Sequence, residues 1–294
     1  MPKLYAISDL HIEVAVNRDA LERLPRYPKD WLILAGDIAN TYASLKAALE
    51  LLNTKFKQLI WVPGNHELWN EDNGNSDLKG VKKYDALVEL CRSLNVITPE
   101  DPYPVWESKS ADGNNTNYTN YVIAPLFLLY DYSFRPDHVS REGALKWAAE
   151  MKIGCTDEHR LNPAPFKTRD DWCESRLRYT ETRLLETQEK GPFILINHYP
   201  LRQEFIRFKR IERFSLWCGT RATHDWHTKY PTHVAVSGHL HMRATDYRDG
   251  VRFEEVSLGY AKHWHHDKGI EGYLREILPG PSKKLLDHGP TWHF

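Results

Sequence analysis

Seven short apolar runs, each closed by a polar or glycine residue, constrain the fold of this chain more than any other feature of its sequence. They are residues Leu4–Ser8, Trp31–Ala35, Leu59–Val62, Tyr121–Ala124, Phe193–Ile196, Val234–Ser237 and Phe253–Ser257. The runs are rich in Val, Ile and Leu and do not alternate with polar residues, which is typical of strands buried on both faces. Helical patterns at Ala43–Leu52 and Lys82–Leu94 lie between the early runs. Strands and helices that alternate at this pitch predict an α/β layered fold.

The 294 residues are enough for one large α/β domain. We expect a single domain over residues 1–278, with a helical or cap-like insertion around 131–190. Its clearest helical patterns are Gly143–Lys152 and Asp171–Lys190. Residues 107–120 are polar and rich in Asn, and we expect a surface loop there. Residues 279–294, which contain several Pro and Gly, are expected to form an irregular tail.

Composition excludes several classes of protein. The net charge of −1 provides no electrostatic field for binding nucleic acid or an anionic membrane. The four cysteines show no CxxC spacing, so we interpret them as reduced thiols rather than a zinc ribbon or a disulfide scaffold. The start of the chain reaches Asp9 too soon for a signal peptide, and no apolar stretch approaches the roughly 20 residues that span a bilayer. We therefore expect a cytoplasmic protein without a membrane partner.

Five of the apolar runs are followed directly by Asp, His or Asn. The residues concerned are Asp9, His11, Asp37, Asn65, His66, His198, His239 and His241. In α/β sheets, functional sites assemble at such strand ends. Carboxylate and amide oxygens with imidazole nitrogens are ligands for divalent first-row metals, and seven of them suit two ions rather than one. Glycines precede Asp37, Asn65 and His239, and we expect them to let the backbone turn sharply there.

The order of these blocks resembles the calcineurin-like metallophosphoesterase superfamily, whose pattern is DxH, GD, GNH, a lone His and GHxH. Here the blocks are Asp9-Leu10-His11, Gly36-Asp37, Gly64-Asn65-His66, His198 and Gly238-His239-Leu240-His241. The resemblance implies a four-layer α/β sandwich in which two mixed β-sheets are flanked by helices. It does not extend to residues 107–190 or to the tail.

The resemblance also implies the role of each residue. It assigns Asp9, His11 and His241 to one metal ion. It assigns Asn65, His198 and His239 to a second, with Asp37 bridging the two. His66 stays free of metal and acts as the general acid, while a hydroxide that bridges the ions attacks phosphorus in line. The mixed oxygen and nitrogen donors accept Mn, Fe, Zn, Co or Ni, and among these we expect Mn²⁺ or an iron-containing pair.

One position departs from two branches of the superfamily. Protein Ser/Thr phosphatases have an acidic residue three positions after the bridging Asp, paired with the catalytic histidine, whereas this chain has Asn40. Purple acid phosphatases have a metal-binding tyrosine at that position, and the nearest tyrosine here is Tyr42. The departure disfavours both branches and leaves the hydrolase interpretation intact.

Residues outside these blocks have competing interpretations. The basic stretch from Arg202 to Arg213 is either a solvated amphipathic helix or a wall that binds an anionic substrate through Arg202, Arg207 or Arg210. We interpret Glu67 as a structural residue at a helix start. The tract His263-Trp264-His265-His266 is expected to be a surface loop near the site. Trp61 and Trp69 are expected in the core, with substrate stacking as the alternative.

We therefore predict a metal-dependent hydrolase of phosphate esters that acts on a phosphomonoester or phosphodiester of small or medium size. A nuclease or a cyclic-nucleotide phosphodiesterase is the alternative within the enzymes, although a basic stripe suited to long nucleic acid is missing. A non-catalytic protein-binding scaffold on the same fold is the alternative outside them. The oligomeric state does not follow from the sequence.

Overall fold

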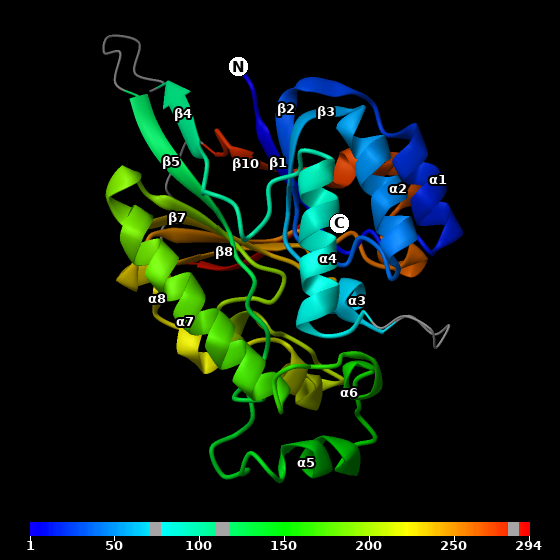
Figure 1. The fold of residues 1–294 in the computed structure, drawn as a ribbon, viewed down its shortest axis with the longest axis vertical. Helices are drawn as coiled ribbons and strands as arrows, with labels where there is room; N and C mark the ends of the chain where they lie inside the picture. Colours follow the sequence, from blue (N-terminus) through cyan, green and yellow to red (C-terminus); the bar gives the residue numbers. More distant parts are fainter. Residues whose placement is uncertain (71–77, 110–117, 282–287) are drawn as a thin grey trace.

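Two β-sheets packed face to face, with helices on both outer faces, make up the fold (Figure 1). The computed structural model describes residues 1–70, 78–109, 118–281 and 288–294. The smaller sheet has the strand order β10-β1-β2-β3. Its strands are β1 (Leu4–Ile7), β2 (Tyr27–Leu34), β3 (Phe56–Trp61) and β10 (Arg275–Leu278). The first three run parallel, and β10 is antiparallel to β1.

The larger sheet has the strand order β11-β8-β9-β7-β6-β5-β4. Its strands are β4 (Val105–Lys109), β5 (Tyr118–Pro125), β6 (Phe193–Ile196), β7 (Thr232–Ser237), β8 (Ala244–Arg248), β9 (Val251–Glu255) and β11 (His288–Trp292). Strands β5, β6, β7 and β9 run parallel, and β4, β8 and β11 add antiparallel pairs at the edges. Both sheets are therefore mixed.

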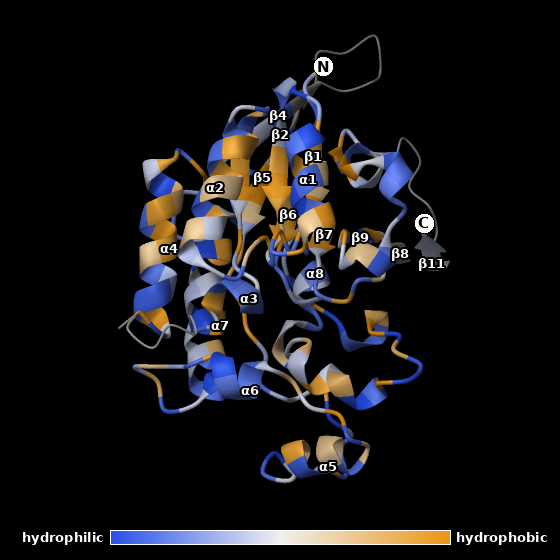
Figure 2. Ribbon diagram, turned by 90° about the vertical axis from the view of Figure 1, so that its right-hand side faces the viewer, coloured by the Kyte–Doolittle hydropathy of each residue, from blue (hydrophilic) through white to orange (hydrophobic). Residues whose placement is uncertain are grey.

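The interface between the sheets is an apolar core, in which Ile33 and Ile60 of the smaller sheet meet Ile194 and Val236 of the larger. Helices α1 (Ala15–Arg23), α2 (Tyr42–Asn53) and α4 (Val81–Ser93) cover the outer face of the smaller sheet. Helices α7 (Arg169–Thr187) and α8 (Trp226–Lys229) cover that of the larger. Figure 2 shows the central strands as predominantly hydrophobic. The predicted four-layer sandwich is confirmed. The apolar runs in the sequence are unbroken because the central strands are buried on both faces.

The insertion around residues 131–190 has two parts. Helix α7 belongs to the outer layer, where Leu184 is buried against the larger sheet. The shorter helices α5 (Ala144–Glu150) and α6 (Asp157–Arg160) lie beyond the sheets, at the lower end of the molecule in Figure 1. Helix α3 (Asn65–Leu68) is near the same end. The insertion is thus partly a layer of the fold and partly a structure beside the strand ends.

All seven apolar runs form strands, but other elements escaped the sequence analysis. The expectation of an irregular tail is wrong for His288–Trp292, which form β11 and pair with β8. Pro290 argued against a strand, yet an edge strand tolerates proline because one side of its backbone needs no partner. The loop expected over 107–120 is wrong at its ends, since β4 and β5 extend to 109 and from 118. Residues 110–117 lie outside the described residues.

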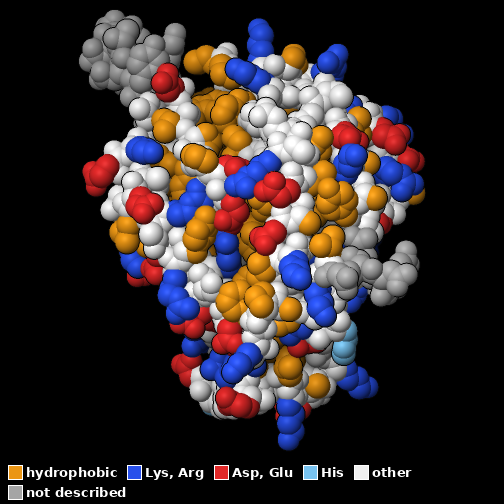
Figure 3. Space-filling model, in the orientation of Figure 1, with side chains coloured by type: hydrophobic (Ala, Val, Ile, Leu, Met, Phe, Trp, Pro, Cys, Tyr) orange, Lys and Arg blue, Asp and Glu red, His pale blue; other side chains and the backbone are white. Residues whose placement is uncertain are grey.

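Charged side chains are spread over the surface. In the view of Figure 3, Lys and Arg are interspersed with Asp and Glu, in keeping with the net charge of −1. None of the helices in the described ranges is long and apolar enough to cross a membrane.

Candidate metal centre

The carboxyl ends of strands from both sheets meet at one place, and all seven predicted ligands lie there. Three overlapping groups have potential ligand atoms within 4.8 Å of one another. The groups are Asp9 with His11 and His241, His11 with Asp37 and His66, and Asp37 with His198 and His239. Because His11 and Asp37 each belong to two groups, the arrangement is one continuous cluster rather than separate sites.

The backbone at the ligands adopts an uncommon conformation. Five predicted ligands have positive φ angles, namely Asp9 at 53°, His11 at 41°, Asp37 at 55°, His239 at 71° and His241 at 52°. Residues other than glycine rarely occupy this region, and such strain gathers at functional sites. The ligand residues themselves therefore make the turns that aim their side chains at a common centre.

The glycines act differently from the expectation. Among those before Asp37, Asn65 and His239, Gly36 alone has a positive φ, of 88°. Gly64 and Gly238 are needed for space, since a Cβ at Gly64 would lie 2.1 Å from Oδ1 of Asp37. A Cβ at Gly238 would lie 2.2 Å from Oγ of Ser8. Close approach of the backbone to the ligands, rather than a sharp turn, explains these two glycines.

The first group presents its free atoms inward. Oδ2 of Asp9 accepts hydrogen bonds from Oγ of Ser8 (2.6 Å), Oγ of Ser257 (2.8 Å) and the backbone N–H of His239 (2.9 Å). Oδ1 is left facing Nε2 of His241 at 3.0 Å, and Nε2 of His11 is 3.2 Å from the same nitrogen. Three potential ligand atoms thus converge on one point.

His263 determines which nitrogen of His241 faces that point. Nδ1 of His263 accepts the backbone N–H of Tyr260 (3.1 Å) and lies 3.2 Å from Nδ1 of His241. Since Nδ1 of His263 already accepts from Tyr260, a hydrogen bond between the two rings has Nδ1 of His241 as its donor. Nε2 of His241, which faces Oδ1 of Asp9, is then the nitrogen that offers a lone pair to a metal once it has lost its own proton. The tract around His263 is a loop beside the site, as predicted.

In the group of Asp37, His198 and His239, a hydrogen bond to the backbone also orients a potential ligand atom. Nδ1 of His198 donates to the backbone oxygen of Ala35 (2.9 Å), which directs its Nε2 towards Oδ2 of Asp37 at 3.5 Å and Oδ1 of Asn65 at 3.3 Å. Nε2 of His239 is buried and makes no hydrogen bond within the described residues. Buried nitrogen without a partner is costly unless a ligand completes it. The donor set and this nitrogen fit the divalent ions predicted from the sequence.

The protonation of the cluster follows from burial and from its carboxylates. Burial lowers the pKa of His11 to about 3 and, together with the charge of His198, lowers the pKa of His239 to about 3. Burial also opposes the charge on His198, but Asp37 and Asp9 outweigh it and raise the pKa of His198 to about 10. Burial disfavours ionised Asp9 as well, yet His241, His198 and His11 hold its pKa well below the usual range. His11 and His239 are therefore neutral before a metal binds, whereas His198 must lose a proton to bind a metal.

His66 lies at the edge of the cluster, and its Nδ1 is hydrogen-bonded to a residue that is not a predicted ligand. Its Nδ1 is 2.7 Å from Oδ1 of Asn40, and its Nε2 is 3.7 Å from Oδ2 of Asp37. The ring of Trp69 packs against that of His66, with centroids 3.7 Å apart. Glu67 is structural, as interpreted, because its carboxylate accepts the backbone N–H groups of Asp37 (2.9 Å) and Gly64 (2.8 Å). Glu67 thereby links the segment that contains Asp37 to the segment that contains Gly64 and Asn65.

A cavity of about 440 Å³ opens onto the cluster. Its lining combines metal-ligand candidates and His66 with apolar and aromatic residues. The apolar and aromatic residues are Trp69, Phe208, Ile211, Phe214, Leu240 and Tyr260. Trp69 is therefore both largely buried and exposed to the cavity, whereas Trp61 is a core residue.

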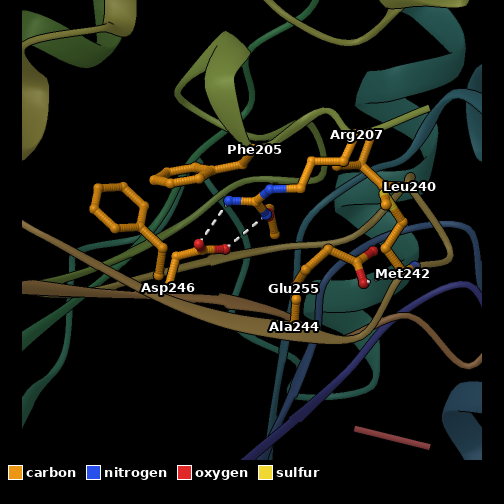
Figure 4. Close-up of a pocket in the computed structure, with 9 residues that line it drawn as sticks. Phe205, Arg207, Leu240, Met242, Ala244, Asp246 and Glu255 are labelled. Atoms are coloured by element: carbon orange, nitrogen blue, oxygen red, sulfur yellow. Dashed lines mark hydrogen bonds and ion pairs between the residues drawn. The ribbon is translucent and has the colours of Figure 1, made fainter. Parts of the chain in front are cut away.

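The basic stretch does not form the amphipathic helix of one interpretation, and its contact with an anionic substrate stays a prediction. Residues 202–213 form two short 3₁₀ segments, Gln203–Phe205 and the start of Glu212–Trp217, rather than an amphipathic helix. Arg202 donates to Glu204 (2.7 Å), and Arg207 pairs with Asp246 (Figure 4). None of the predicted arginines is among the described residues that line the cavity. Arg210 is exposed next to Ile211, which does line it.

Three side chains near the cluster escaped the sequence analysis or had no role in it. Tyr260 stacks on His11 with centroids 4.4 Å apart, and His263 fixes His241. Asp157 is fully buried and bonds to Asn65 and Trp69. No signal in the sequence pointed to Asp157 or Tyr260, because both lie outside the motif blocks and reach the site through tertiary structure. A cluster of histidines was the one available hint for His263.

The fold and the ligand cluster together define a metal-dependent phosphoesterase. The chain belongs to the calcineurin-like phosphoesterase family, whose model matches residues 2–243. It is thus a phosphoric ester hydrolase.

Two comparisons with a particular relative are close. The chain is 43% identical over 282 residues to the [acyl-carrier-protein] phosphodiesterase PptH of Mycobacterium tuberculosis, covering 95% of this chain and 84% of the relative. It also superposes on the crystal structure of the phosphopantetheinyl hydrolase PptH from the same organism. That match has a TM-score of 0.87, 42% identity, and coverage of 96% of this chain and 98% of the other.

Proposed function

We propose that this chain is a phosphodiesterase that removes phosphopantetheine from an acyl carrier protein by hydrolysing the phosphodiester between them. The observation that carries the proposal is the likeness to PptH over nearly the full length of both chains. Such a substrate combines a phosphodiester, an extended arm and a protein. It is larger than the small or medium substrate that we expected from the sequence, and the expected cytoplasmic location is compatible with it.

The ligand cluster supports a reaction at phosphorus. Asp9, His11 and His241 would hold one divalent ion, Asn65, His198 and His239 a second, and Asp37 would be shared. When bound, such ions supply Lewis-acid stabilisation of charge on the phosphoryl oxygens and activation of water. The roles of the individual ligands follow the family pattern. Oxygen and nitrogen donors accept Mn, Fe, Co, Ni or Zn, and of these Mn²⁺ is the ion that we propose.

His66 is the residue that we propose as general acid. Oδ1 of Asn40 can accept the Nδ1–H of His66 in both protonation states of the ring, so Nε2 is the nitrogen that gains and loses the transferable proton. Nε2 faces the cavity beside Asp37. In hydrolysis of a phosphopantetheinyl carrier, the oxygen that leaves phosphorus becomes a hydroxyl of the carrier protein. We assign protonation of that oxygen to His66.

The shape of the cavity supports an elongated substrate with an apolar portion. Phe208, Phe214 and Leu240 line the cavity together with the predicted ligands, and the ring of Phe214 is stacked with that of His239 with centroids 6.0 Å apart. A phosphate bound at the cluster would leave an attached arm to run along this lining. An apolar lining stabilises such an arm by removing its methylene groups from water.

Mass spectrometry of a phosphopantetheinyl acyl carrier protein incubated with the Mn²⁺-loaded enzyme tests the proposal. We expect the carrier to lose the phosphopantetheinyl mass, and the His66→Ala variant to leave it intact. The matched controls are p-nitrophenyl phosphate and bis(p-nitrophenyl) phosphate. Rapid hydrolysis of the monoester with an unchanged carrier would overturn the proposal and favour a phosphomonoesterase. Cleavage of single-stranded DNA or a cyclic nucleotide under the same conditions would favour the nuclease or cyclic-nucleotide alternative.

A further inference from the structure

We propose that Asp157, a residue of the insertion, is a positioning residue that fixes both a metal ligand and the ring that packs against the proposed acid. One of its oxygens, Oδ1, accepts a hydrogen bond from Nδ2 of Asn65 at 3.0 Å and another from Nε1 of Trp69 at 2.6 Å. All three side chains are buried, and Asp157 is 0% exposed. The proposal rests on the metal centre and not on the identity of the substrate.

The bond to Asn65 decides which atom of its amide faces the cluster. An amide can be turned by half a rotation about its last bond, which exchanges its oxygen and its nitrogen. A carboxylate oxygen accepts but does not donate, so Asp157 holds Nδ2 of Asn65 and turns Oδ1 towards His198. Without this acceptor, the Nδ2 group, which has no lone pair for a metal, could occupy the ligand position.

The bond to Trp69 acts on the residue beside the proposed acid. Trp69 packs against His66 with ring centroids 3.7 Å apart, and its Nε1 donates to Asp157. The indole ring therefore has a fixed orientation against the imidazole. One carboxylate oxygen thus connects the proposed ligand Asn65 to the neighbour of the proposed acid.

Asp157 is itself held by the insertion. Arg169, the first residue of α7, donates to the backbone oxygen of Asp157 at 2.6 Å and to Glu158 at 3.0 Å. Nε1 of Trp217 also donates to Glu158, at 2.7 Å. The backbone N–H of Asn70 donates to the oxygen of Arg160 at 2.8 Å, which joins this segment to the chain after Trp69. The insertion therefore completes the centre, and it is not a detachable cover.

The test compares Asp157→Ala with Asp157→Asn by titrating Mn²⁺ alone into the full-length apoprotein, followed by electron paramagnetic resonance. Oδ2 of Asp157 makes no hydrogen bond to the described residues, so asparagine keeps the one oxygen that matters. We expect Asp157→Ala to weaken one of two Mn²⁺ equivalents by about tenfold, the usual effect of losing a partner of a metal ligand. Asp157→Asn should bind both equivalents within about threefold of the wild type.

Trp69→Phe separates the two bonds, because it removes the indole N–H and leaves Asn65 bound to Asp157. We expect this variant to keep both Mn²⁺ affinities and to lose kcat towards bis(p-nitrophenyl) phosphate. Should Asp157→Ala not fold, Asp157→Leu has nearly the same shape as aspartate without an acceptor and replaces it in the titration. Wild-type Mn²⁺ binding in the variant without an acceptor, or equal losses in it and in Asp157→Asn, would overturn the proposal. Neither result depends on whether a carrier protein is the substrate.

Discussion

Nδ1 of His66 lies 2.7 Å from the side-chain oxygen of Asn40, a neutral partner at a position where protein Ser/Thr phosphatases have a carboxylate. The amide oxygen fixes the imidazole ring, but it stabilises an imidazolium less than a carboxylate would. Asn40→Ala should therefore lower kcat by about tenfold through loss of ring orientation. Asn40→Asp keeps an oxygen acceptor for Nδ1 of His66, so it should restore most of the kcat that Asn40→Ala loses. A kcat for Asn40→Asp as low as that of Asn40→Ala would contradict this role.

Replacing His66 and replacing Asp37 are predicted to have different effects on kcat and on metal content. His66→Ala should lower kcat by about 10²- to 10⁴-fold, the range for loss of a general acid, while metal content is retained. Asp37 shares one group with His11, a proposed ligand of the first ion, and another with His198 and His239, proposed ligands of the second, so Asp37→Ala should lose metal from both positions. Elemental analysis of the purified variants, alongside kcat, separates these outcomes. Equal metal loss in the two variants would show that their assigned roles are wrong.

The motif blocks were readable from the sequence because the ligands follow strands whose burial leaves a local signature. Asp9 comes two residues after Ile7 and Asp37 three residues after Leu34, so neighbouring parallel strands suffice to bring them together. The backbone conformation at Asp9 and Asp37 could not be predicted from the sequence. Sharp turns were expected at the glycines, but apart from Gly36 the positive φ angles of these blocks occur at the predicted ligands, where tertiary contacts enforce a conformation that local propensity opposes.

The parts that were missed depend on contacts between distant segments. Asp157 lies 92 positions from Asn65, and no local pattern marks a buried aspartate as the partner of an amide. Strands β4, β8, β10 and β11 were missed because they lie at or near the sheet edges, where exposed polar side chains weaken the apolar signal. Tyr260 reaches His11 through the chain that follows β9, which the motif pattern does not include.

His263 should influence metal binding without being a ligand. It accepts the Nδ1–H of His241, which keeps the lone pair of that ring on the side of the cluster. His263→Ala should weaken Mn²⁺ binding by about tenfold, and His263→Gln, which keeps an acceptor, should restore part of the loss. Isothermal titration calorimetry measures both affinities. His265→Ala is the matched control from the same tract, since His265 is exposed, and a loss equal to that of His263→Ala would contradict the orienting role.

Metal binding should release protons and strengthen as the pH rises. In the metal-free protein the pKa of His198 is raised to about 10, so its ring is protonated at pH 7 and must become neutral to bind a metal. The pKa values of His11 and His239 are lowered to about 3, so these rings release nothing at neutral pH. Calorimetric titration with Mn²⁺ in buffers of different ionisation enthalpy should detect proton release at pH 7, with apparent affinity rising from pH 6 to 9. Binding without proton release would contradict the charge assigned to His198.

Arg207 should contribute to stability rather than to catalysis. Its guanidinium donates to both carboxylate oxygens of Asp246, at 2.9 and 2.6 Å, and both residues line a small cavity whose lining includes none of the predicted ligands (Figure 4). The side chain of Asp246 is 4% exposed, so Arg207→Ala would leave a buried carboxylate without a counter-charge. We expect a loss of about 3 kcal/mol in the free energy of unfolding, the low end for a broken buried pair, because Arg207 itself is 24% exposed.

Urea unfolding of the Arg207→Ala variant measures this loss, and Arg207→Met/Asp246→Leu should recover most of it because neither residue then carries a charge. The kcat/KM of Arg207→Ala should equal that of the wild type below the unfolding transition. Arg210→Ala is the matched comparison, because Arg210 is exposed next to the cavity-lining Ile211 and is the predicted substrate contact that the structure leaves best placed. A lower kcat/KM for Arg207→Ala with unchanged stability would restore Arg207 as a substrate contact. In that case the arginine would have to leave Asp246 when substrate binds, at the expense of the buried pair.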